Sequence, residues 1–283
     1  MEIIIQTSKE ISKESKSSFY YTFSLLPSNK RDAMNTVYAF CRKTDDIVDN
    51  EEQDIHTKQN NLEEWKLKLT NALNGKTDNK LFSELYYFVN EFNIPHQPFY
   101  DLIAGMEMDL TKIRYQNFDE LKEYCYNVAS TVGLMTIPII GYKNDSAKDY
   151  AINLGIALQL TNILRDIKTD SKRGRIYLPL DELAQFNYSE DDLFKRSYNE
   201  NFINLMKFQS ERAREFYKAA DRKLSIEDKA SMFTPRSMEY IYYRLLDKIE
   251  QENFNIFSKK IRVSNFNKLF ITFFVWLKYK LLS

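Results

Sequence analysis

Two segments of the chain carry acidic residues at helical spacing, with apolar residues between them. In segment 38–49 and again in segment 159–170, four polar residues lie three or four positions apart. Residues at that spacing share one face of an α-helix. The first set comprises Tyr38, Arg42, Asp45 and Asp49, and the second comprises Gln159, Asn162, Asp166 and Asp170. The fold must therefore contain two helices that each present an acidic face.

The chemistry of these faces depends on their surroundings. Two carboxylates one helical turn apart repel each other by roughly 0.2–0.5 kcal/mol when exposed, and burial makes the pair far more costly unless a cation lies between them. A single acidic pair on a helix is usually solvated surface, where Arg42 simply pairs with Asp45 or Asp46. The duplication and the two amide side chains instead favour a site for a hard divalent cation such as Mg²⁺.

Turn-forming residues are scarce. The 283 residues include only six Gly and six Pro, and apolar residues recur at helical spacing in many windows. We find no run of alternating apolar and polar residues, so the pattern predicts an all-α protein with a single domain over residues 1–283. Helices are expected over 30–49, 57–74, 78–92, 96–111, 117–142, 146–170, 179–187, 199–222 and 235–257.

Charge and composition exclude several classes of protein. Lys plus Arg equals Asp plus Glu at 40 each, so no global field points to a nucleic-acid partner. The glycines form neither a P-loop nor a dinucleotide fingerprint. Two cysteines and an N-terminus without a signal-peptide pattern indicate a cytoplasmic location.

The C-terminal region has two interpretations. Residues 269–277 form an apolar run flanked by Lys268, Lys278 and Lys280, and this run is shorter than the ~20 residues that span a bilayer. It is either the last helix of the core or, with the rest of 269–283, an interfacial tail that holds the protein peripherally on the inner face of a membrane.

Several motifs, taken in order, resemble the squalene/phytoene synthase family, and the similarity runs from about residue 17 to residue 269. The matching motifs lie at 18–27, 38–49, 105–110, 124–135, 154–166 and 173–179. The resemblance implies an isoprenoid-synthase helical bundle with a central cavity. It also implies a prenyltransferase that joins two prenyl diphosphates head to head through a cyclopropyl diphosphate.

The resemblance further assigns roles to individual residues. Two or three Mg²⁺ ions per site would be held by Asp45, Asp49, Asn162, Asp166 and Asp170, and Tyr124 would join the four aspartates in catalysis. NADPH is not expected to be required. The substrate-binding residues would be Ser18, Phe19, Tyr38, Arg42, Val128, Gly133, Gln159, Arg165, Arg175, Tyr177 and Tyr242. Tyr124, Val128 and Gly133 are expected to line the cavity, and Arg175 and Tyr177 to lie just beyond the second acidic segment.

Three positions depart from the family pattern. Thr169 stands where relatives often carry a further acid, which weakens metal binding a little, and Ser130 replaces a common Gly, which is expected to narrow the cavity. The third departure is the start Ser17-Ser18-Phe19, which is shifted by one position from the family pattern, so the serine that contacts diphosphate is either Ser17 or Ser18.

The product and the class of activity leave alternatives open. The leading interpretation is condensation of two farnesyl diphosphates to presqualene diphosphate or a squalene-type product, as in hopanoid synthesis. The alternative is phytoene synthesis from two geranylgeranyl diphosphates, at the head of a carotenoid pathway. A non-catalytic prenyl-lipid binder would not need two intact acidic segments together with Arg42 and Arg165. A terpene cyclase is disfavoured by the motif at 173–179.

Overall fold

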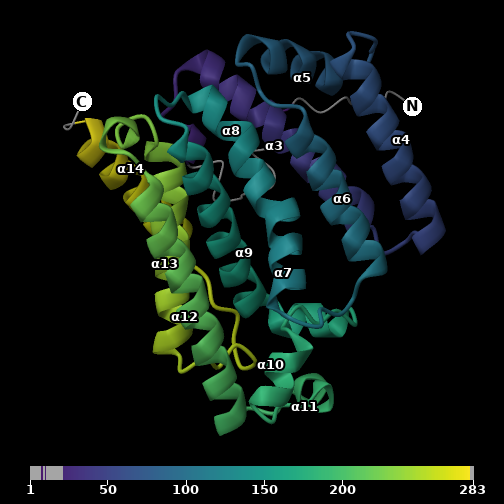
Figure 1. Ribbon diagram of the computed structural model, residues 1–283, viewed down its shortest axis with the longest axis vertical. Helices are drawn as coiled ribbons and strands as arrows, with labels where there is room; N and C mark the ends of the chain where they lie inside the picture. The colour runs from purple at the N-terminus through teal and green to yellow at the C-terminus, as the bar shows by residue number, and fades with distance from the viewer. Residues whose placement is uncertain (1–7, 9, 11–21, 281–283) are drawn as a thin grey trace.

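The protein is built from α-helices, which confirms the predicted fold class. A computed structural model describes residues 8, 10 and 22–280, and these residues form no β-strand, only an isolated bridge between Arg114 and Ile176. The first helices are α3 (Ser28–Asp49), α4 (Ile55–Leu73), α5 (Lys80–Glu91), α6 (Gln97–Thr111), α7 (Phe118–Cys125), η1 (Tyr126–Ser130), α8 (Thr131–Ile140) and α9 (Ser146–Lys172). Then follow α10 (Leu180–Gln185), α11 (Glu190–Lys195), α12 (Glu200–Lys223), η2 (Ile226–Asp228), α13 (Phe233–Gln251) and α14 (Asn265–Lys280), as Figure 1 shows.

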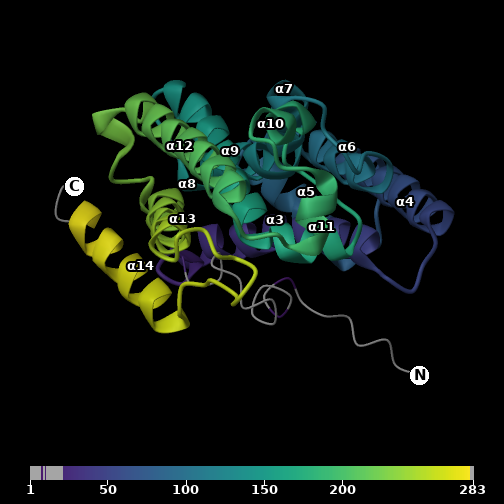
Figure 2. The same ribbon diagram turned by 90° about the horizontal axis from the view of Figure 1, so that it is seen from below.

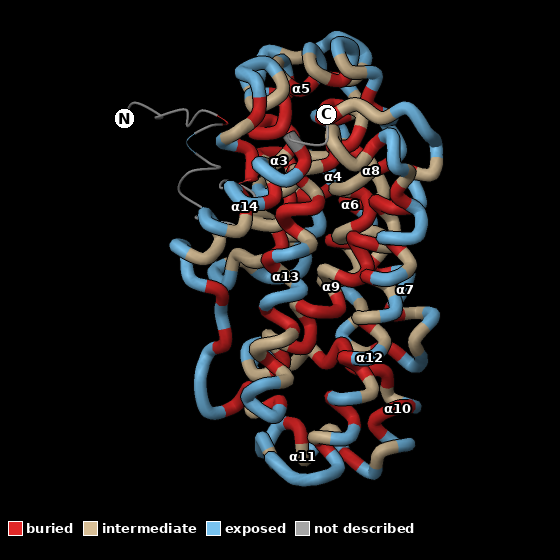
Figure 3. The backbone as a smooth tube through the Cα atoms, turned by 90° about the vertical axis from the view of Figure 1, so that its left-hand side faces the viewer, coloured by how far each residue is buried: buried red, intermediate tan, exposed pale blue. Residues whose placement is uncertain are grey.

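The longest of these helices, α9, occupies the middle of the bundle. It packs against α8, η1, α12 and α13 (Figure 1). Its apolar residues at helical spacing, such as Leu154, Ala157 and Leu164, are buried, while exposed residues collect in the loops and on the outer turns (Figure 3). The second acidic segment is therefore part of a helix that is held rigidly in the core.

The region predicted as one helix over 117–142 contains a π-helical turn. In η1 the backbone N–H of Thr131 donates to the carbonyl of Tyr126, five residues earlier. This turn packs against α9 where that helix carries Gly155, and a Cβ at Gly155 would lie 2.5 Å from Cα of Ser130. The missing side chain at Gly155 is thus what lets η1 approach α9 so closely.

Most predicted helix ends lie within two or three residues of the observed ones. The helix predicted to reach residue 257 ends instead at Gln251, because Asn253 and Phe254 take left-handed φ values of 48° and 63°. Helix α11 was not predicted, although Ser189 and Asp192 form a capping box at its start. This capping box is the sequence signal from which the start of α11 could have been predicted.

Candidate active site

A cavity of about 310 Å³ lies between α3, α6, α8, α9 and α13. This volume is at the lower end of the range of about 300–1,000 Å³ that small-molecule sites occupy. Most of the wall is apolar, whereas Arg42, Asp45, Gln159 and Asn162 stand together as polar residues of the wall. Among the predicted site residues, the wall contains Tyr38, Arg42, Asp45, Val128, Gly133, Gln159, Asn162 and Tyr242.

The cavity has a polar end and an apolar end. Helices α3 and α9 end close together, since Arg173 Nη1, just after α9, lies 3.4 Å from Asp49 Oδ1 at the end of α3. The wall runs along α3 from Asp45 to Met34 and along α9 from Asn162 to Ala151. Eleven helical positions span about 16 Å at 1.5 Å per residue. The cavity therefore suits a long apolar ligand with a charged head.

The first acidic segment forms one side of the polar end. Arg42 Nη1 lies 2.8 Å from Asp45 Oδ2, and Arg42 Nη2 lies 2.6 Å from Asp46 Oδ1. Burial, followed by the charge of Asp49, raises the pKa of Asp45 to about 6, although Arg42 acts in the opposite direction. The charge of Arg42 thus does not offset the combined effect of burial and of Asp49 on Asp45.

The second acidic segment forms the facing side. Arg165 Nε donates to Asp166 Oδ1 at 2.9 Å, and a second guanidinium nitrogen binds the other carboxylate oxygen. Burial, followed by the charge of Asp166, raises the pKa of Asp170 to about 7. Asn162 Nδ2 donates to Gln159 Oε1 at 3.3 Å, whereas the buried Oδ1 of Asn162 has no hydrogen-bond partner within the part of the chain that the structure describes. This oxygen is available to a ligand.

A fifth carboxylate, Asp109 of α6, extends the site beyond the cavity. Tyr177 donates to Asp109 Oδ1 at 2.7 Å, and Tyr124 donates to Asp109 Oδ2 at 3.0 Å. Burial raises the pKa of Asp109, despite the opposing effect of Arg175. Asp109 was absent from the predicted site residues, although its helix turn belongs to the motif at 105–110.

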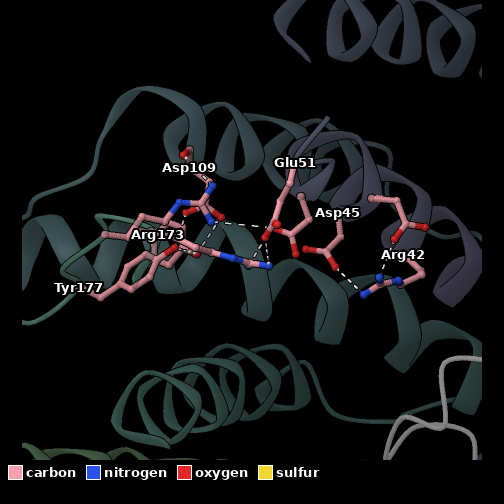
Figure 4. Close-up of polar contacts among 10 residues, drawn as sticks. Arg42, Asp45, Glu51, Asp109, Arg173 and Tyr177 are labelled. Atoms are coloured by element: carbon pink, nitrogen blue, oxygen red, sulfur yellow. Dashed lines mark hydrogen bonds and ion pairs between the residues drawn. The ribbon is translucent and has the colours of Figure 1, made fainter. Parts of the chain in front are cut away.

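Two arginines after α9 connect these groups. Arg173 lies 3.4 Å from Asp49 and 3.2 Å from Glu51, and Arg175 lies 3.8 Å from Asp49. Figure 4 shows the resulting row of side chains, from Tyr177 and Asp109 at one end to Asp45 and Arg42 at the other. Carboxylates from α3, α6 and α9 are therefore interleaved with arginines, an arrangement suited to binding phosphate groups together with cations.

Comparison with known proteins identifies the family. The model of the family "Squalene/phytoene synthase" matches residues 12–267. The chain belongs to the squalene/phytoene synthase family. It is 40% identical over 266 residues to a chloroplastic phytoene synthase 2 of Solanum lycopersicum, covering 92% of this chain and 86% of the relative. It is 39% identical to a chloroplastic phytoene synthase of an Oncidium hybrid, of whose length it spans 64%.

Solved structures of the family have the same fold. A dehydrosqualene synthase in complex with ligand superposes with a TM-score of 0.85 at 28% identity, covering 96% of this chain and 95% of that one. The squalene synthase HpnC from Alicyclobacillus acidocaldarius superposes with a TM-score of 0.80 at 25% identity, covering 90% and 97% of the two chains. The predicted family and helical architecture are thus confirmed.

The carboxylate and amide oxygens of the two acidic segments are of the type that binds Mg²⁺, although they are not arranged around a single point. Within 22–280 and the two described residues before it, no three His, Cys, Asp or Glu side chains are grouped as a metal site. The oxygen donors are hard, and Asn162 Oδ1 has no partner among the described residues. Burial and a neighbouring carboxylate raise the pKa values of both Asp45 and Asp170, so a cation beside them would be favourable. By donor type and charge, these residues fit the ion.

Two family-based expectations about the cavity wall are wrong. Tyr124 does not line the cavity, because its hydroxyl is directed to Asp109 and its ring stacks 5.1 Å from the ring of Tyr177. Ser130 does not narrow the cavity, because it is buried and its hydroxyl donates to the carbonyl of Ile152 at 2.8 Å.

The remaining family-based expectations concern residues beyond the cavity and near the N-terminus. Arg175 and Tyr177 lie beyond the second segment, next to Asp109. Ser17, Ser18 and Phe19 fall outside the described residues.

Proposed function

We propose that this protein is a Mg²⁺-dependent prenyltransferase that condenses two prenyl diphosphates head to head, with phytoene as its product. One observation carries the proposal. Helices α3 and α9, which each carry carboxylates paired with an arginine, face each other at the polar end of one long apolar cavity. A diphosphate with a prenyl tail has the same division between a charged head and an apolar chain.

The charged residues have complementary roles. Asp45 and Asp49 on one side, and Asp166, Asp170 and Asn162 on the other, would hold the ions. Bound Mg²⁺ would neutralise diphosphate charge and make it a better leaving group. Arg42 and Arg165, which now pair with Asp45 and Asp166, would then be free to donate to diphosphate oxygens.

The cavity wall has the task of protecting an allylic cation. Departure of diphosphate would leave this cation on the first substrate. The double bond of the second substrate would attack it, and loss of a proton, which the released diphosphate can accept, would close a cyclopropyl diphosphate. Departure of the second diphosphate and loss of a second proton would then give the C40 product. Water at this stage would trap the cation as an alcohol, and the apolar wall excludes water. Phe23, Tyr38 and Tyr242 border the cavity, and their π faces can stabilise a cation without reacting with it.

The choice of product follows the relatives. The sequence motifs alone favoured two farnesyl diphosphates by a narrow margin, whereas identities of 39–40% to plant phytoene synthases support two geranylgeranyl diphosphates. The dehydrosqualene synthase structure, at 28% identity, favours the shorter substrate as a second candidate. The higher identity, over 92% of the chain, supports phytoene as the proposed product.

A competition assay tests both the reaction and the substrate. Purified protein, Mg²⁺ and equal amounts of farnesyl and geranylgeranyl diphosphate are incubated without NADPH, and products are identified by mass spectrometry. We expect a C40 triene; a C30 product would transfer the assignment to the second candidate. Cyclised products of one substrate would indicate a terpene cyclase, and a strict NADPH requirement would contradict the proposal.

A further inference from the structure

Helix α14 is apolar on two opposite faces. One face packs on α13 and buries Thr272, Val275 and Tyr279. On the other face, Phe266 and Phe270 are 75% and 62% exposed. Figure 2 shows α14 at the edge of the bundle, beside α13. The second apolar face is therefore turned to the outside of the molecule.

The exposed apolar residues of α14 form a continuous stripe. They are Phe266, Leu269, Phe270, Phe273, Phe274 and Leu277, which we call the outer stripe. At about 100° per residue these positions cover an arc of about 140°. Single exposed apolar residues are ordinary, whereas a contiguous group marks an interaction surface. We therefore expect the outer stripe to contact an apolar partner.

The charge around the outer stripe identifies the kind of partner. From residue 258 to the C-terminus the sequence contains six basic residues and no acidic one, in a chain whose net charge is zero. The basic residues are Lys259, Lys260, Arg262, Lys268, Lys278 and Lys280. Of these, Lys278 is exposed at the edge of the outer stripe, whereas Lys268 lies on the inner side of α14 and Lys259 pairs with Glu252. A second copy of this helix would bring charges of the same sign together. An anionic surface complements them.

We propose that α14 lies in the interface of a lipid bilayer containing anionic phospholipid, with the outer stripe turned toward the acyl chains. A helix with Phe and Leu on one face, an exposed lysine at its edge and a basic segment just before it is suited to that position. Within the described residues, no helix is both long enough and apolar enough to cross a membrane. The proposed contact is therefore in the plane of the membrane.

The position of α14 connects the proposed membrane contact to the cavity. Arg236 Nε of α13 donates to the hydroxyl of Tyr279 at 3.0 Å, which ties the two helices together. The same α13 contributes Thr234, Met238 and Tyr242 to the cavity wall. A membrane-bound α14 thus leaves one helix between the lipid and the cavity, close to where a hydrocarbon product would dissolve. This use rests on the proposed function, whereas the membrane contact itself does not.

Vesicle sedimentation of the full-length protein tests the contact. The probes are vesicles of phosphatidylcholine alone and of three parts phosphatidylcholine to one part phosphatidylglycerol. We compare the wild type with the double variant Phe270→Glu/Phe274→Glu. The matched control is Ile55→Glu/Leu67→Glu on α4, where the two side chains are 58% and 60% exposed. Truncation is avoided because it would also remove the buried face of α14.

The expected result is tight binding to the anionic vesicles only. The stripe variant should bind these vesicles at least about 10-fold more weakly, and the control should bind like the wild type. Circular dichroism should show both variants folded. Absence of wild-type binding, or equal binding of the stripe variant, would overturn the proposal. Self-association that the stripe variant abolishes, without vesicle binding, would assign the stripe to a second copy instead. No substrate is present, so failure here is distinct from failure of the proposed condensation.

Discussion

The contact between Gly155 of α9 and the backbone of η1 makes a sharp prediction for the substitution Gly155→Ala. The added Cβ would lie 2.5 Å from Cα and 2.6 Å from N of Ser130, where ordinary contacts begin at 3.4 Å. Relief requires a separation of roughly 0.9 Å between α9 and η1. The obstructing atoms belong to the backbone, so no change of rotamer can supply this movement.

The expected magnitude is the balance of two opposing effects. Overpacking of a dense interior costs about 1–3 kcal/mol, and the obstruction by backbone places this case at the upper end. Replacing Gly by Ala inside a helix returns about 1 kcal/mol through helix propensity. The net destabilisation is about 1–2 kcal/mol, which corresponds to a fall in Tm of roughly 2–8 °C for a chain of this size.

Thermal and urea denaturation, followed by circular dichroism, measure this loss. The matched control is Gly133→Ala in α8, where the new Cβ would lie 3.1 Å from the Cβ of Ala151 and 3.2 Å from its carbonyl oxygen, both much farther than the atoms of Ser130 from a Cβ at Gly155. That neighbour need move only a few tenths of an ångström, so the gain in propensity should leave the control close to wild-type stability. If Gly155→Ala is as stable as the control, the close approach of η1 does not depend on the missing side chain.

Two further predictions concern the acidic segments. Asp166→Asn should lower kcat at least about 100-fold at saturating Mg²⁺, with little change in Tm. The control Asp149→Asn, at an exposed position on the same helix, should leave kcat unchanged. Near-normal turnover of Asp166→Asn would refute the metal assignment. The pKa of Asp170 is raised to about 7, so its contribution to the stability of metal-free protein is present below pH 4 and is lost as the pH rises to 7. In EDTA, Asp170→Asn should therefore increase Tm at pH 8 but not at pH 4. Mg²⁺ should raise the Tm of the wild type more at pH 8 than at pH 4. If the Tm of wild type and variant depends on pH in the same way, this reasoning is wrong.

The acidic segments could be recognised from the sequence because their information is local. Asp45 and Asp49 are one helical turn apart, and so are Asp166 and Asp170, so helical spacing alone brings each pair together. The scarcity of Gly and Pro indicated long helices for a similarly local reason. Their facing across one cavity, by contrast, required the family resemblance.

Asp109 could not be found in that way. It is a single carboxylate on α6, and its hydrogen-bond partners Tyr124 and Tyr177 lie 15 and 68 positions away in the chain. The resemblance placed Tyr124 in the cavity wall, whereas its direction is decided by this long-range hydrogen bond. Helix α14 was ambiguous for another reason, because a helix with two apolar faces matches both the core and the interfacial pattern.

The π-helical turn η1 determines how its segment would respond to a change in length. A π turn holds one residue more than a regular turn, so deletion of any residue from 126–130 would allow unbroken α-helical bonding from α7 into α8. Because the π turn absorbs the extra residue within itself, the two halves would keep nearly their present phase, and Val132, Gly133 and Thr136 would stay in the cavity wall. The loss would be confined to the bulge that lies against Gly155 of α9. In engineering this scaffold, we therefore expect single-residue deletions to be tolerated better in this segment than in the regular turns of α8, where each would rotate the rest of the helix by about 100°.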